Sequence, residues 1–452
     1  MKFRASYKKY QRFKDENTKH FILLFYALLI GIISGLLGGF FRITLSYVEN
    51  FRNTLFQSAS NSIFFSWLWP IIFAIIGIAI SLFLVRKFAP EASGSGVQEI
   101  EGALDDIRPM RWKRVLPVKF IASLFSLGSG LLLGREGPTI QLGANIGKMV
   151  KDVLGQSSKI ENNPLISAGA ASGLSSAFNA PFAGIIFVIE EMHGHFKFNF
   201  YSVAAIMIGA GTADFIVRLL IGSKPIINMM VFPSPNIYGL WLFIVIGLLC
   251  SIIGYIYNKL LIQSLDLFKF TNNIPIIYSA IFIGLIIALI GIFYSDMIGG
   301  GYDTITKVLD NSFSLSFLLL LFVIRLLLSF FSYSFGLPGG IFLPMLTLGI
   351  ILGMLFGITM QPYFPNLISH PGVFAIAGMA GIFSATVRAP LTGLVLAIEM
   401  TSNYELILPL IITTVTASVF TTILGNKPIY ATLLKRTLDN DKSSRKQKNN
   451  II

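Results

Sequence analysis

The sequence predicts an all-α polytopic membrane protein made of two inverted-topology repeats, and three observations support this class. Of its 452 residues, 54% are hydrophobic and only 13% are charged, with a mean hydropathy of +0.73. This composition is typical of polytopic membrane proteins. The uncharged stretches 21–41 and 326–387 are long enough to cross a bilayer, and the second has room for several helical pieces. Finally, motifs of the first half recur in the second half, next to apparent helix breaks.

The net charge of +13 is concentrated at the ends of the chain. Residues 1–20 carry seven basic residues against two acids, and residues 435–452 carry six against two. Basic flanks favour the cytoplasmic side and anionic headgroups, so we expect both termini in the cytoplasm, a lipid bilayer partner and no nucleic acid. We expect a transmembrane domain at 21–434, with halves of about 21–222 and 223–434, between basic segments at 1–20 and 435–452.

After the first predicted span, 21–41, and the second, 62–85, the chain becomes small and polar. Gly94-Ser95-Gly96 offers a hydroxyl between two flexible residues, as a loop that approaches a ligand closely would. Alone, such a triplet is typical of a linker, but here it precedes an interrupted helix. The uncharged stretch 120–134 follows, bounded by Lys119 and Arg135. We interpret both as interfacial cations that raise the local anion concentration.

The stretch Gly134-Arg135-Glu136-Gly137-Pro138 places an acid and a base between two apolar segments. A charged side chain at mid-membrane costs about 2.5–3.5 kcal/mol even on permissive insertion scales, so Glu136 is a candidate functional residue. Pro138 suits the first turn of a helix, and a helix that begins inside the bilayer directs unpaired N–H groups at an anion. The alternative, a carboxylate that only complements its own helix, fits a soluble protein better. We therefore predict broken helices that meet at a mid-membrane anion site.

The uncharged stretch 162–189 ends at Glu190-Glu191, whose side chains point in different directions on a helix. One of these acids could face cytosolic water and the other the protein interior. That both are solvated helix-end acids remains an equal alternative.

The two halves align at nearly constant offsets. The matched positions are Ala180-Pro181 with Ala389-Pro390, Gly169 with Gly378, Glu190 with Glu399, Pro138 with Pro344, and Gly143 with Gly349. The second-half partner of the Glu136 segment, residues 339–344, has no acid or base. This asymmetry fits an anion held by backbone N–H groups on one side and gated by a carboxylate on the other. After a last span at 406–426, Tyr430 lies at a helix start, as a belt residue or as a hydroxyl donor to the anion.

These residues together resemble the CLC family of chloride channels and chloride/proton antiporters, over roughly residues 20 to 434. The resemblance rests on four ordered features, which are Gly94-Ser95-Gly96, Gly134 to Pro138, Gly340-Ile341-Phe342-Leu343-Pro344, and Tyr430. One departure is Gln98, where many relatives have proline, so the path of the first loop is an open question. The chain matches the short form of the family, without cytoplasmic regulatory domains.

The resemblance implies a function for the chain. It implies that Ser95 and Tyr430 hydroxyls and the N–H groups of Ile341 and Phe342 coordinate chloride. Glu136 would be the gate, which competes with chloride and leaves when protonated, and Glu191 the internal proton-transfer residue. The family is homodimeric with one pore per subunit, and we expect the interface at 180–220 and 400–425. The chain is thus expected to exchange chloride for protons across a prokaryotic inner membrane.

Two other functions remain to be weighed. A passive chloride channel of the same fold is disfavoured, but not excluded, by Glu191. An intramembrane enzyme using Glu136 and Glu191 would need a nucleophile or a metal, and the sequence has none of the usual motifs. The single cysteine, Cys250, excludes a disulfide within the chain and a cysteine metal cluster. We therefore expect no enzymatic activity, metal or cofactor, only transported chloride and protons.

Overall fold

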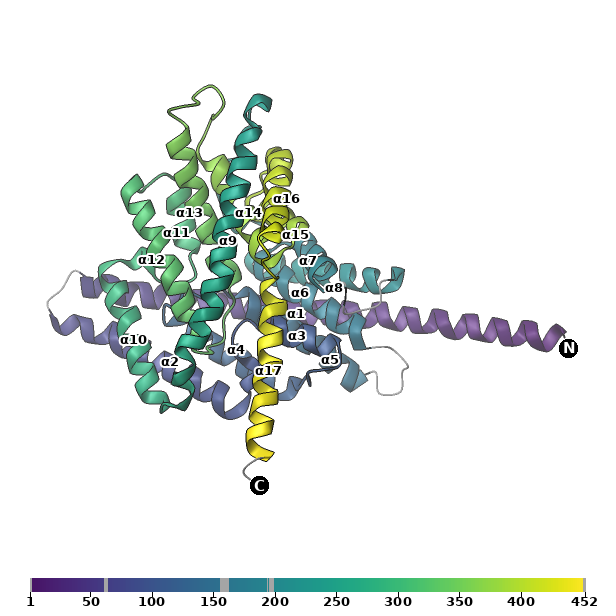
Figure 1. Ribbon diagram of the computed structural model, residues 1–452. Coiled ribbons are helices and arrows are strands. Elements are labelled where there is room, and N and C mark those ends of the chain that lie inside the picture. Colours follow the sequence, from purple (N-terminus) through teal and green to yellow (C-terminus); the bar gives the residue numbers. More distant parts are fainter. Residues whose placement is uncertain (1, 61–63, 155–161, 193, 195–198, 450–452) are drawn as a thin grey trace.

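The computed structural model describes residues 2–60, 64–154, 162–192, 194 and 199–449, and these residues form a helical protein (Figure 1). The helices are α1 (Lys2–Ser60), α2 (Leu68–Phe88), α3 (Val97–Leu104), α4 (Trp112–Gly128), α5 (Glu136–Leu154), α6 (Asn162–Phe178), α7 (Pro181–Glu191), α8 (Phe200–Ile221), α9 (Trp241–Leu267), α10 (Ile276–Phe293), α11 (Tyr302–Leu309), α12 (Leu315–Ser334), α13 (Phe342–Met360), α14 (Gly372–Val387), α15 (Pro390–Thr401), α16 (Ile407–Ile423) and α17 (Ile429–Asn449). Of the two basic tails, residues 1 and 450–452 lie outside the described part.

Eight helical segments among the described residues are long and apolar enough to cross a membrane. Seven of them bury only 39–44% of their most apolar window, so they present a broad apolar face to lipid. The segment formed by α13 differs, because 78% of its window is buried. Protein therefore surrounds α13, and the predicted polytopic helical class is confirmed.

Helices α1–α8 and α9–α16 repeat one packing arrangement. In the first half α5 packs on α6, α1 on α8 and α6 on α8; in the second half α13 packs on α14, α9 on α16 and α14 on α16. Each helix thus has a counterpart eight helices later, and α17 (yellow in Figure 1) stands outside the repeat. The expected division near residue 222 falls between α8 and α9.

The equivalent helices α7 and α15 run antiparallel, which makes the repeat inverted. Glu399, near the end of α15, accepts a hydrogen bond from the N–H of Ala183 at the start of α7, at 2.6 Å. Glu190, at the end of α7, accepts one from the N–H of Thr392 at the start of α15, at 2.7 Å. Each carboxylate satisfies N–H groups that lack an acceptor within their own helix. Glu190 is therefore a helix cap, and Glu191 is the acid left for another role.

Matched glycines bring the backbones of paired helices into contact. A Cβ atom added to Gly143 or Gly169 would collide with the carbonyl oxygen of the other residue, at the crossing of α5 and α6. The same holds for Gly349 and Gly378, at the crossing of α13 and α14. Small residues allow this close approach of helices in membranes. Glycines matched by sequence in the two halves thus have the same packing role.

The first helix is longer than the span expected at 21–41. It continues through residue 20 and past Arg42, and its N-terminal part projects from the body in Figure 1. Arg42 is buried without ending the helix, because it donates hydrogen bonds to the Ser176 carbonyl oxygen and the Asn179 Oδ1 atom. A charge that marks a membrane boundary in the sequence is here satisfied inside the protein.

We expect the Gly169→Ala variant to be less stable than the wild type. The added methyl group must displace the α5 backbone, and overpacking of this kind costs about 1–3 kcal/mol. The measurement is the Tm of the purified protein in detergent. The control is Thr359→Ala, at an exposed position near the end of α13 and outside the expected interface. Equal Tm values for the two variants would contradict the backbone contact between α5 and α6.

Candidate functional site

Three loops from different parts of the chain join at the centre of the protein. The N–H of Gly134 donates to the carbonyl oxygen of Gly340 at 2.7 Å, and the N–H of Gly340 donates back at 2.6 Å. The N–H of Gly339 donates to the carbonyl oxygen of Gly94 at 3.0 Å. Backbone hydrogen bonds therefore join the loops before α3, α5 and α13 into one unit, here called the loop unit.

The first loop depends on two glycines. Gly96 precedes α3 with φ of +90°, a left-handed conformation that side chains disfavour. Gly137 lies against Ser95, because an added Cβ atom would come within 2.6 Å of the Ser95 hydroxyl. Gln98, where the resemblance left the loop path open, begins a regular α3 and is buried. The serine is thus brought directly to the start of α5.

Lys119 holds this loop from α4. It is fully buried, and its ammonium group donates to the carbonyl oxygens of Ala92 (2.9 Å), Gly94 (2.7 Å) and Ser95 (3.3 Å). The interpretation of Lys119 as an interfacial cation is therefore wrong. Its three N–H donors are matched by three backbone carbonyl groups, which offsets the cost of burying the charge.

Two buried hydroxyls face each other near these loops. The side chains of Ser95 and Tyr430 are fully buried and interact electrostatically. Neither hydroxyl has a hydrogen-bond partner of normal geometry among the described residues. Buried hydroxyls without partners are rare and indicate a bound group that satisfies them. The location therefore fits a small anion that accepts two O–H donors.

The start of α13 supplies further donors. Ile341 is the residue before the helix and Phe342 is its first residue, where N–H groups have no acceptor within the helix. The ring of Phe342 packs against Tyr430, with centroids 6.1 Å apart, and against Phe383 at 4.8 Å. This packing brings the predicted chloride ligands from α13 and α17 together. Pro344, like Pro138 in α5, lies in the first turn of its helix, where its missing N–H costs nothing.

An ion-pair network connects α3 to α17, the helix that carries Tyr430. The guanidinium of Arg108 donates to both oxygens of Glu99, at 2.9 and 3.0 Å. It also pairs with Asp441 on α17, the helix that carries Tyr430. A forked arginine contact fixes orientation as well as distance. The network therefore anchors α17 to α3, which follows the Ser95 loop directly.

Glu136 is fully buried where α5 and α13 begin. Its Oε1 atom accepts a hydrogen bond from the Tyr302 hydroxyl at 3.1 Å. Its Oε2 atom packs against the Cα atom of Gly134, near the backbone N–H of Leu343 in the first turn of α13. No bond of normal geometry to Oε2 occurs within the described ranges. The carboxylate thus lies at the positive ends of two helix dipoles, where an anion would also bind.

The motif's arginine is not a ligand of this carboxylate. Arg135 is half-buried, and its guanidinium lies over the ring of Tyr302, 4.3 Å from the centroid. Cations are attracted to aromatic faces at such distances. Tyr302 was not among the residues expected at the site. The sequence feature that points to it is the run of three glycines, 299–301, directly before its helix.

Glu191 lies apart from Glu136, at the C-terminal end of α7. It is half-buried, and the charged groups that act on it are Glu101, Glu190 and Arg388. It also acts electrostatically on Tyr430, which in turn faces Ser95. Glu191 and Ser95 thus both act on the same hydroxyl, that of Tyr430. The described residues contain no group of three or more His, Cys, Asp or Glu side chains that could hold a metal ion.

Comparisons with known proteins agree with this geometry. A family model described as voltage gated chloride channel matches residues 77–422. The chain is 43% identical over 434 residues to the H(+)/Cl(−) exchange transporter ClcA of Vibrio cholerae, covering 95% of this chain and 93% of the relative. It is 41% identical to the ClcA protein of Salmonella paratyphi A, covering 97% and 93%.

Solved structures share the fold. A slow cyanobacterial Cl−/H+ antiporter is 37% identical, with a TM-score of 0.88 over 92% of this chain and 98% of the other. A eukaryotic CLC transporter has a TM-score of 0.78 at 21% identity, over 91% and 73%. From the family match, the curated relatives and the shared fold together, this chain belongs to the CLC family of voltage-gated chloride channels and transporters.

Proposed function

We propose that this protein is a chloride/proton antiporter in which a protonatable glutamate gates the anion pathway. The observation that carries the proposal is the buried Glu136 carboxylate at the start of two helices, in the same loop unit as the buried Ser95 hydroxyl that faces Tyr430. The exchange activity named for the ClcA relatives and for the cyanobacterial structure supports it. This family role is transport, and we propose no cofactor beyond the transported ions.

Chloride in this proposal is held by neutral donors. Ser95 and Tyr430 supply O–H groups, and Ile341 and Phe342 supply N–H groups at the start of α13. Each donor lies on an element whose position is fixed by backbone hydrogen bonds or ion pairs, so little reorganisation accompanies binding. Lys119 contributes indirectly, because it holds the carbonyl groups of the Ser95 loop away from the anion.

The gate follows from competition between like charges. The Glu136 carboxylate and a chloride ion are both attracted to the N-termini of α5 and α13, and they repel each other there. Protonation removes this repulsion and weakens the hold of the helix dipoles on the side chain. Chloride entry and protonation of Glu136 therefore favour each other, and this linkage is what an exchanger requires.

Glu191 is the proposed internal proton-transfer residue. Its carboxylate lies at the C-terminal end of α7, and its field extends to Tyr430 beside the proposed anion site. Protons would reach Glu136 from the Glu191 side, while chloride moves past Ser95 and Tyr430. The proton and chloride routes would therefore be separate on one side of the protein and would join at Glu136.

We also propose how the protein assembles and in which membrane it lies. The transmembrane domain of residues 21–434 would act as a homodimer with one pore per subunit, with 180–220 and 400–425 at the interface. Exposed apolar side chains on α8 and α16, among them Phe215 and Val419, support an apolar contact there. We place the protein in a bacterial inner membrane with both termini cytoplasmic, as the basic ends 1–20 and 435–452 favour.

In liposomes with an imposed chloride gradient and the potential clamped by potassium and valinomycin, we expect uphill proton movement. The Glu191→Gln variant should abolish this proton flux and retain chloride flux, because the proton donor alone is removed. The control is Glu405→Gln, which neutralises an exposed acid before α16 and should leave both fluxes unchanged. Chloride flux without proton movement in the wild type would instead indicate a passive channel.

The Glu136→Gln variant should show chloride flux that no longer depends on pH between about 4 and 8, and no coupled proton flux. A neutral amide cannot exchange a proton, so the linkage between the two ions is lost. Chloride efflux and proton uptake are measured on the same liposome preparation. Uphill proton movement by this variant would show that another residue is the gate.

A further inference from the structure

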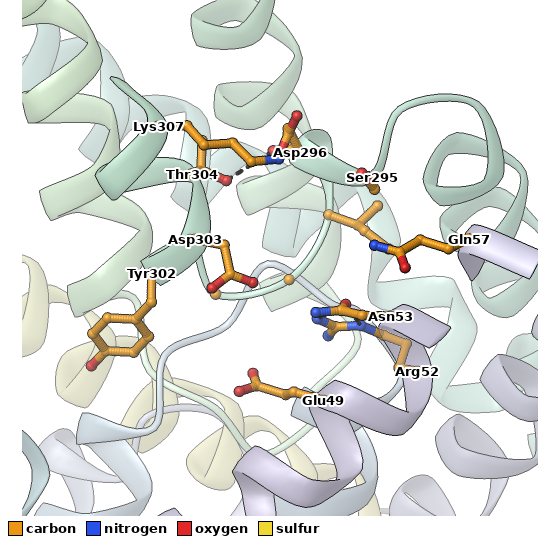
Figure 2. Close-up of a pocket in the computed structure, with 14 residues that line it drawn as sticks. Glu49, Arg52, Asn53, Gln57, Ser295, Asp296, Tyr302, Asp303, Thr304 and Lys307 are labelled. Atoms are coloured by element: carbon orange, nitrogen blue, oxygen red, sulfur yellow. Dashed lines mark hydrogen bonds and ion pairs between the residues drawn. The ribbon is translucent and has the colours of Figure 1, made fainter. Parts of the chain in front are cut away.

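Tyr302 occupies a boundary between a polar pocket and the gating carboxylate. The pocket has a volume of about 270 Å³, and its wall includes Glu49, Arg52, Asp303 and Tyr302. Figure 2 shows the Tyr302 ring at the edge of this pocket, with its hydroxyl directed away from Asp303 and Glu49. The hydroxyl donates instead to the Oε1 atom of Glu136, 3.1 Å away. The Tyr302 side chain thus lines the pocket, while its hydroxyl group contacts the Glu136 carboxylate.

The ring and its loop are firmly held. The guanidinium of Arg135 lies 4.3 Å from the ring centroid. The N–H of Gly299 donates at 2.7 Å to the carbonyl oxygen of Gly130, in the loop that leads to Glu136. Arg325, buried in α12, donates to the carbonyl oxygens of Asp296 (2.8 Å) and Gly299 (3.0 Å). The Tyr302 hydroxyl is therefore placed by a fixed support rather than by a mobile loop.

The repeat explains why this loop reaches the gate. Gly299 and Gly301 have positive φ values of 73° and 118° and precede α11, as Gly94 and Gly96 precede the equivalent helix α3. The loop before α11 is thus the counterpart of the loop that presents Ser95. It has a glycine at the serine position and instead directs a hydroxyl from the first residue of its helix.

We propose that Tyr302 is a positioning residue of the gate, whose hydroxyl holds the charged Glu136 carboxylate in the blocking position from the side of this pocket. This inference rests on the proposed gating role of Glu136. A hydrogen bond donated to a carboxylate stabilises its charged form. The Tyr302 hydroxyl therefore disfavours both the protonation of Glu136 and its departure from the blocking position. Without this hydroxyl, Glu136 would be protonated, and the anion pathway would open, at higher pH.

Several other charged groups act in the same region. Arg135 and, from α1, Arg42 act on Tyr302. Glu49 on α1 and Asp303 on α11 line the neighbouring pocket, with Arg52 and Lys307. Arg325 on α12 approaches the same loop from the other side. All of these groups stay in place when only the tyrosine oxygen is removed, so a changed pH profile reports the hydroxyl itself.

The test compares Tyr302→Phe with wild type by chloride efflux from liposomes between pH 4 and 8. The phenylalanine keeps the ring that Arg135 covers and removes one donor. We expect the pH of half-maximal efflux to rise by about one unit, the size expected for a hydrogen bond to a charged group. The control, Tyr26→Phe, removes a hydroxyl that donates to the Leu154 carbonyl oxygen at 2.8 Å, and should leave the midpoint unchanged.

A double-mutant cycle separates this role from a structural one. In a Glu136→Gln background, Tyr302→Phe should leave the pH profile flat and change the efflux rate much less than in the wild type. An unchanged or lowered midpoint in the single variant, or an equal rate change in both backgrounds, would overturn the inference. Chloride efflux measures the opening of the gate whether or not protons are coupled to it. A failure of the antiport proposal would be recognised separately, by the absence of uphill proton movement.

Discussion

The buried carboxylate of Glu136 lies at the N-termini of α5 and α13, and much of the surrounding structure serves this arrangement. A charge inside a membrane protein is costly unless local dipoles and donors compensate for it. Here two helix starts and the Tyr302 hydroxyl do so. In the proposed function chloride uses the same helix starts, so the groups that stabilise the Glu136 carboxylate would also attract its competitor.

The inverted repeat is what brings two helix starts to one place. Equivalent helices such as α7 and α15 run antiparallel, and α5 and α13 both begin at buried residues inside the protein. Backbone hydrogen bonds between Gly134 and Gly340 then join the halves at the centre. The halves are chemically unequal at this point, because only α5 begins with an ionisable residue.

Two buried cations hold the ligand-bearing loops at equivalent positions of the repeat. Lys119 on α4 binds carbonyl groups of the loop before α3, and Arg325 on α12 binds carbonyl groups of the loop before α11. Both cations donate to backbone carbonyl groups and so satisfy acceptors inside the protein. In the proposed function this leaves N–H and O–H donors free to bind the anion.

The sequence by itself determined the membrane class, the repeat and the helix start next to Glu136, because hydropathy and the positions of proline and glycine can be read directly from it. The resemblance to the CLC family supplied the candidate ligands. It did not determine what Lys119, Glu190 or Tyr302 contact. Lys119 binds carbonyl groups 24 to 27 residues away, Glu190 caps a helix about 200 residues later, and Tyr302 reaches Glu136 across 166 residues. No local pattern encodes such partners. Only the packing of the two halves decides which buried polar groups meet, since each must find a donor or acceptor inside the protein.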